Sequence, residues 1–245
     1  LLCGREAPLR EVARSLRMTS QGASGRKEGV PASLMQRCRG GRVGRQDLNF
    51  DCVPPHADFT LSSRASDQIR TILRAAILSK PLLIEGDPST GKTSAVAFAA
   101  HLMQQPLLQF SMTPGTSIGD LVGSIGVNQD LGGLVFQEGV LTTAMKEGYW
   151  LILDEANLAP DAVLRILEDV LNDGRLTIPA SLVAADPRRK QELSADGTMI
   201  VQSHPAFRLF AAQNPPPFFH LPGDTSPHVR LAPLPLPLHG LQCAG

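Results

Sequence analysis

Apolar residues between Ser63 and Pro216 follow two patterns that alternate along the chain. Short runs in which nearly every residue is apolar predict buried strands, whereas apolar residues three or four positions apart predict amphipathic helices. The predicted strands are PLLIE, LLQFSM, YWLILDE and FRLFAAQNP, and the predicted helices span residues 63–80 (with Ser66 as N-cap), 92–104, 140–147 and 159–174. Strands that alternate with helices are typical of an α/β fold with a parallel sheet.

Two stretches between these elements do not fit the alternation. The glycine-rich stretch from Gly115 to Gly133 has no clear period, and we interpret it as a loop with an inserted hairpin. The segments RLTIP and TMIVQ have the pattern of two hairpin arms, separated by a polar loop at Ala184–Gly197. We therefore expect the sheet to carry two insertions.

Composition divides the chain into three parts. Residues 1–58 are rich in Arg, Ser and Gly, and we predict a basic segment of low order, because ten Arg or Lys stand against four Asp or Glu between Leu1 and Phe50. Residues 59–216 hold the predicted core. Residues 217–245 are dense in proline and have no strand or helix period, so we predict a disordered tail.

The overall charge points to no polyanionic partner. The chain has 23 Lys or Arg and 23 Asp or Glu, which predicts neither direct nucleic-acid binding nor binding to a membrane surface. No apolar run approaches the roughly 18 residues of a membrane span. Four Cys that lie far apart, without the spacing of zinc ligands, favour a reduced intracellular protein. Because the chain begins with Leu, we expect a fragment of a longer protein.

A phosphate-binding loop is predicted between the first strand and the second helix. The stretch Gly86–Thr93 matches the pattern GxxxxGKT completely. Its glycines let the backbone amides curl around phosphates, and the following helix presents free N–H groups to the same anion. The alternative, a glycine turn with a surface lysine, is disfavoured by the position between a strand and a helix. The predicted nucleotide-binding residues are Gly86, Asp87, Pro88, Ser89, Thr90, Gly91, Lys92, Thr93 and Ser94.

Polar residues at the ends of two later strands complete the predicted chemistry. In WLILDE, Asp154 is the candidate ligand of Mg²⁺ together with Thr93, and Glu155 is the candidate base that orients and deprotonates water. Ligands of parallel sheets bind at the carboxyl ends of strands, which would place Asn214 beside Glu155. The alternatives are an acidic residue at an ordinary turn, and an asparagine that starts a turn before Pro215.

The order of these parts resembles an ATPase module of the dynein-related AAA+ group, and within it the very large ribosome-assembly ATPases. The resemblance covers Phe59 to Pro216, and LILDEANLAPDAVL is its most specific piece. It implies a P-loop NTPase (AAA+) three-layer sandwich, with ATP and Mg²⁺ as cofactors. It makes Lys92 and Thr93 the Walker A pair, Asp154 and Glu155 the Walker B pair, and Asn214 the sensor. It places the helix-2 insertion in Gly119–Gln137 and makes the second hairpin the pre-sensor hairpin.

The same resemblance implies partners and a location. The implied partners are neighbouring AAA+ modules in a ring and a protein substrate such as a pre-ribosomal particle. The implied location is the nucleus. The family continues after the sensor with an arginine finger and a helical lid, whereas here Arg230 is the only arginine after Asn214 and its context differs. We therefore expect a module without the family's C-terminal strand and helical lid, and weak ATP hydrolysis by the isolated chain. Two alternatives stay open: a nucleotide-binding scaffold without turnover, and a module of another AAA+ protein, such as a mitochondrial ATPase with a von Willebrand domain.

Overall fold

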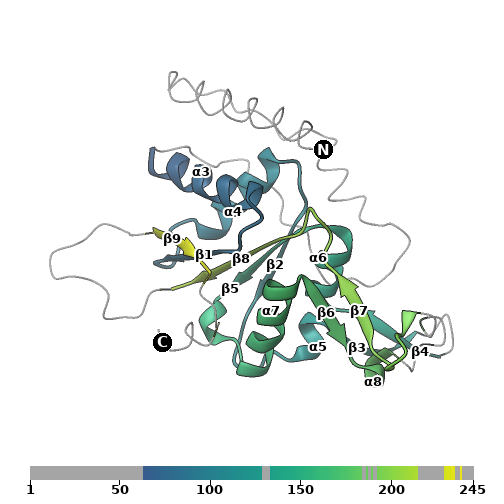
Figure 1. Cartoon of the computed structure of the whole chain (residues 1–245). Coiled ribbons are helices and arrows are strands. Elements are labelled where there is room, and N and C mark those ends of the chain that lie inside the picture. The colour runs from purple at the N-terminus through teal and green to yellow at the C-terminus, as the bar shows by residue number, and fades with distance from the viewer. Residues whose placement is uncertain are drawn as a thin grey trace, which may run out of the picture.

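A five-stranded sheet forms the centre of the computed structural model, which describes residues 63–128, 133–183, 186, 189, 192–214, 229–234 and 238. The strand order is β2-β5-β8-β1-β9, and β2, β5, β8 and β1 run parallel (Figure 1). The strands are β1 (Leu82–Gly86), β2 (Leu107–Ser111), β5 (Trp150–Asp154), β8 (Arg208–Gln213) and β9 (Val229–Pro233). The predicted segment 1–58 lies outside the described residues.

Helices cover both faces of the sheet, because the strand side chains alternate between two apolar clusters. Leu82 and Ile84 of β1 pack on one face with α3 (Ser63–Ile77) and α4 (Lys92–Leu102). Leu83, between them, packs on the opposite face with α6 (Val140–Glu147) and α7 (Asp161–Asp173). The predicted three-layer α/β sandwich is therefore confirmed.

Helix boundaries follow local signals for most of the chain. Helices α6 and α7 end at Gly148 and Gly174, whose φ values of 75° and 65° are left-handed and favour glycine. The prediction of Ser66 as an N-cap is wrong, because α3 begins at Ser63 and Ser66 lies within its first turn. No helix in the described part of the chain is long and apolar enough to cross a membrane.

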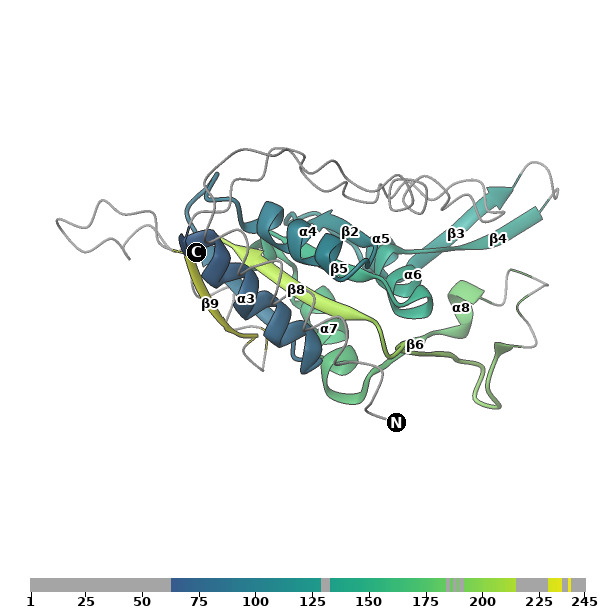
Figure 2. The ribbon, with the colours of Figure 1, turned by 90° about the horizontal axis from the view of Figure 1, so that it is seen from above.

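Both predicted insertions are antiparallel hairpins, and they extend from the same end of the sandwich (Figure 2). The first follows the short helix α5 (Ile118–Leu121) and consists of β3 (Gly123–Asn128) and β4 (Gly133–Glu138). The second consists of β6 (Arg175–Ile178) and β7 (Met199–Gln202), with helix α8 (Ala180–Val183) after β6. A 3-10 helix, η1 (Ala156–Leu158), follows β5.

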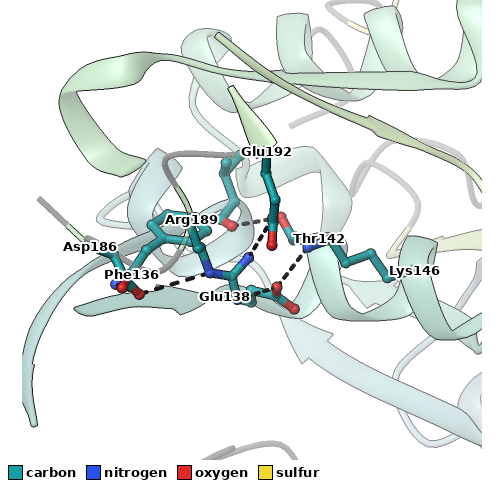
Figure 3. Close-up of polar contacts among 8 residues, drawn as sticks. Phe136, Glu138, Thr142, Lys146, Asp186, Arg189 and Glu192 are labelled. Carbon is teal, nitrogen blue, oxygen red and sulfur yellow. Dashed lines mark hydrogen bonds and ion pairs between the residues drawn. The ribbon is translucent and has the colours of Figure 1, made fainter. Parts of the chain in front are cut away.

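A buried ion-pair cluster joins the two insertions (Figure 3). Arg189, from the loop between β6 and β7, places Nη2 2.7 Å from Glu138 Oε1 at the end of β4. Lys146 of α6 donates to the same oxygen at 2.8 Å. The Arg189 guanidinium also lies 5.5 Å from the centre of the Phe136 ring, and Asp186 accepts from the Phe136 backbone N–H at 3.3 Å. The charged loop of the second insertion is thus anchored to the base of the first.

The sheet does have a fifth strand, which corrects the prediction that the C-terminal strand is missing. Strand β9 pairs antiparallel with the outer edge of β1, from Leu82 opposite Pro233 to Gly86 opposite Val229. Leu234 and Leu238 after it are 7% and 1% exposed and pack in the core. Pro233 is tolerated because it stands at the end of an edge strand, where no ladder hydrogen bond has to be donated. The sheet is therefore mixed, with one antiparallel edge.

Candidate nucleotide-binding site

The predicted phosphate loop lies between the end of β1 and the start of α4. Its backbone takes left-handed conformations at Ser89 (φ 62°) and Gly91 (φ 81°), and the Thr90 hydroxyl donates to the Asp87 carbonyl at 2.7 Å. No described side chain caps α4, whose N-cap is Gly91. The loop therefore turns its backbone toward a helix N-terminus with free N–H groups, an arrangement that binds anions.

Lys92 extends back over this loop. Its Nζ donates to the backbone carbonyls of Gly86 at 2.6 Å and Asp87 at 2.9 Å, and to Asn214 Oδ1 at 3.0 Å. Partial burial lowers the pKa of Lys92, while the carboxylates of Glu155, Asp154 and Asp87 act in the opposite direction. The ammonium is thus held at the mouth of the loop by groups that phosphate oxygens can replace. Of the other predicted loop residues, Pro88 is exposed, and Ser94 lies half-buried in the first turn of α4.

Asp154 lies at the end of β5 beside Thr93. The Thr93 hydroxyl is 3.1 Å from Asp154 Oδ1 and 3.2 Å from Oδ2, and Gln109 Nε2 donates to Oδ2 at 2.5 Å. Burial raises the pKa of Asp154, and the hydrogen bonds from Thr93 and Gln109 oppose that rise. Mg²⁺ is ordinarily held by one or two protein oxygens together with substrate phosphates. A hydroxyl and a carboxylate in contact, next to an anion-binding loop, fit that ion.

Glu155 does not continue the strand. It has φ 52° and ψ 43°, a left-handed conformation, and is the N-cap of η1. The rule that neighbouring strand residues point to opposite faces therefore stops applying at Asp154. The sharp turn after β5 instead brings the Glu155 carboxylate to the side of the sheet edge where Asn214 lies.

Asn214 connects two of the predicted site residues. Its Nδ2 donates to Glu155 Oε1 at 2.8 Å, while its Oδ1 accepts from Lys92. Strand β8, which Asn214 follows directly, lies between β5 and β1 in the sheet. The strand order therefore places Asn214 between Glu155 and Lys92. The sequence analysis predicted its position beside Glu155, but not its contact with Lys92.

Three polar residues near the site were not predicted. Gln109 contacts Asp154, and Gln213, which is 2% exposed, donates to Glu85 Oε1 at 2.7 Å. Glu85 and Gln213 are register partners in β1 and β8. The signal for these three residues is the one that predicts Asp154 and Asn214, a polar residue near the end of an otherwise apolar strand. Arg230 lies on β9, in register with Glu85 of β1.

Three further residues, Trp150, Met112 and His204, have structural roles. Trp150 is buried in the sheet, 5.1 Å from the Phe210 ring, and Met112 is 1% exposed in the core. His204 stands in a turn, where its Nδ1 accepts from the Ala206 N–H at 3.1 Å. These three therefore do not belong to the site.

A phosphate loop between β1 and α4, with an acid at the end of a parallel strand and an asparagine at the end of the next, defines a P-loop NTPase of the AAA+ class. Residues 81–230 match the AAA domain of the dynein-related subfamily. The match covers more than half of the chain, which therefore belongs to that family. The chain is an AAA+ ATPase module of the dynein-related kind.

Known relatives agree with this assignment. The chain is 36% identical over 166 residues to midasin from Dictyostelium discoideum and 35% identical over 159 residues to midasin from Giardia intestinalis, which covers 67% and 64% of this chain. It is 31% identical over 156 residues to mouse von Willebrand factor A domain-containing protein 8, over 62% of this chain. The aligned parts make up only 2%, 3% and 8% of these relatives, so the chain corresponds to a small part of each.

Proposed function

We propose that this chain binds ATP with Mg²⁺ and hydrolyses it. The observation that carries the proposal is the position of Asn214, which contacts both the loop lysine and the acid after β5. A glycine turn with a surface lysine needs no such connection. Nucleotide hydrolysis needs a phosphate-binding cation and a base held at a fixed separation, and Lys92 and Glu155, both bonded to Asn214, would serve as that pair.

Each residue would have a separate role. Lys92 would exchange its bonds to the loop carbonyls for phosphate oxygens, and Thr93 with Asp154 would hold Mg²⁺. Glu155 would orient the attacking water and accept its proton. Asn214 would keep Glu155 and that water in line with the phosphate. Bound ATP and Mg²⁺ would supply the phosphoryl group and the charge that neutralises the leaving oxygens.

The setting of this activity is proposed from resemblance. We propose that the module acts beside other AAA+ modules in a ring and uses hydrolysis to remodel a protein assembly. The similarity to two midasins supports a pre-ribosomal particle as that assembly and the nucleus as its location. The similarity to the mouse von Willebrand factor A domain protein supports a different parent protein. The full parent transcript distinguishes the two, since several tandem modules are expected for a midasin.

The test is a measurement of Mg²⁺-dependent ATP turnover with and without Asn214. We expect Asn214→Ala to bind ATP but to hydrolyse it at least ~10²-fold more slowly, because the general base loses its orientation. ATP binding without any turnover, even beside a neighbouring module, would favour the second candidate, a nucleotide-binding scaffold.

A further inference from the structure

We propose that Gln109 is a positioning residue of the Mg²⁺ site, because its side-chain amide fixes the orientation of the Asp154 carboxylate. The inference rests on the proposed function. It starts from the contacts of that carboxylate: the Thr93 hydroxyl reaches both oxygens, and Gln109 Nε2 donates to Oδ2 at 2.5 Å. Gln109 thus hydrogen-bonds directly to the candidate metal ligand.

The strand register explains why Gln109 reaches Asp154. Strand β2 pairs parallel with β5, with Gln109 opposite Ile152 and Ser111 opposite Asp154. Opposite residues in a parallel pair share a face of the sheet, and so do residues two positions apart. Gln109 and Asp154 therefore lie on one face, one diagonal step apart, and a side chain as long as glutamine spans that step.

The backbone keeps the two strand ends in this register. The Met112 N–H donates to the Asp154 carbonyl at 2.8 Å, directly after β2 ends. Ser111 is closer to Asp154 along the strand, but it makes no side-chain hydrogen bond among the described residues. Gln109 is thus the residue of β2 that controls the carboxylate.

The chemistry of an amide suits this role. Mg²⁺ demands near-ideal octahedral geometry, so a carboxylate that turns freely binds it less well. Thr93 is itself a candidate ligand, and its hydroxyl would have to reorient toward the ion. Gln109 is not a candidate ligand, so its bond can persist when the ion binds. Its amide is also neutral and adds no positive charge that would compete with Mg²⁺.

Gln109 can be replaced without disturbing the core. Its side chain is exposed, whereas the buried contacts of β2 come from Leu107 and Leu108, which are 1% and 3% exposed. Ser111 provides a matched control, because it is exposed on the same strand and face and stands directly opposite Asp154. The effect on the metal can therefore be separated from an effect on folding.

The experiment measures binding of a fluorescent ATP analogue to the 245-residue chain, first in EDTA and then as Mg²⁺ is titrated. Gln109→Ala and Gln109→Leu both remove the donor, and leucine retains most of the side-chain volume. We expect both variants to raise the half-saturating Mg²⁺ concentration at least about tenfold, the usual effect of removing a group that orients a metal ligand. Affinity in EDTA should stay as in the wild type, and Ser111→Ala should change neither quantity.

Three outcomes would overturn the inference. If Gln109→Leu has the same half-saturating Mg²⁺ concentration as the wild type, the hydrogen bond from Gln109 does not contribute to Mg²⁺ binding. An equal loss of affinity in EDTA and in Mg²⁺ would show that Gln109 acts on the loop and not on the ion. If nucleotide binding by the wild type does not depend on the Mg²⁺ concentration, the chain has no Mg²⁺ site of this kind. The proposed function would then fail as well.

Discussion

Asn214 donates a hydrogen bond of 2.8 Å to Glu155, although 59 residues separate them in the sequence. The contact exists because β8 pairs parallel with β5 and both strands end at the same edge of the sheet. It fixes an acid that otherwise stands in a turn, next to the lysine of the phosphate loop.

Replacing Lys92 should weaken nucleotide binding. The Lys92→Ala variant loses a charged donor to phosphate, a contact worth ~1.5–3 kcal/mol, so affinity should fall by about one to two orders of magnitude. Isothermal calorimetry of the 245-residue chain with ATP and Mg²⁺ measures the change. Equal affinities for the wild type and the variant would mean that Lys92 does not contact the nucleotide.

The Glu155→Gln variant should retain ATP and stop hydrolysing it. Glutamine keeps the shape of the side chain and can still accept a hydrogen bond from Asn214, but it cannot take a proton from water. Turnover should fall ~10²–10⁴-fold, the usual contribution of a general base. Release of phosphate under single-turnover conditions measures this, and an unchanged rate would reassign the base to another residue.

Removing Arg189 should destabilise the protein without touching the nucleotide site. Arg189→Ala removes a charged hydrogen bond to the partly buried Glu138, a contact worth about 1.5–3 kcal/mol in the free energy of unfolding, and leaves Lys146 as the remaining cation on that carboxylate. The matched control is Arg70→Ala, which removes an exposed pair with Asp67 and should cost less than about 1 kcal/mol. Urea unfolding of the two variants compares them directly. Equal costs would show that the cluster does not hold the insertions.

Stability should fall on acidification partly through Glu138. Burial alone would raise the pKa of Glu138, but the hydrogen bonds and charges of Lys146 and Arg189 outweigh it and lower the pKa. A carboxyl whose pKa is lower in the folded state stabilises the fold above its unfolded pKa, and that contribution is lost as the pH falls through the folded value. The free energy of unfolding should therefore drop less between pH 5 and pH 3 in Glu138→Gln than in the wild type. Parallel pH profiles would argue against this assignment.

Turnover by the isolated chain should be slow and should rise beside a neighbouring AAA+ module. The dynein-related family uses an arginine finger, which is worth about 10³–10⁵ in rate because it neutralises charge that develops in the transition state. ATPase assays of this chain alone and mixed with an adjacent module of its parent protein test the expectation. Brisk Mg²⁺-dependent turnover by a monomer of this chain would contradict it.

The sequence by itself determined the layers of the fold and the chemistry of the loop. Strands β1, β2, β5 and β8 and helices α4, α6 and α7 could be predicted, because a buried strand and an amphipathic helix impose their own periods on neighbouring residues. The phosphate loop could be predicted because its sequence motif is local. The conformation at Gly91 and the helix that starts at Lys92 depend on a few adjacent residues.

Only the tertiary structure decided which distant residues meet. Strand β9 has no period of its own, and it forms because the edge of β1 offers unpaired N–H and C=O groups. Gln109 reaches Asp154 because of the register between β2 and β5, and Glu155 faces Asn214 because the chain turns left-handed after β5. Strand order and register are set by the packing of the whole sheet, so no local stretch of sequence contains them.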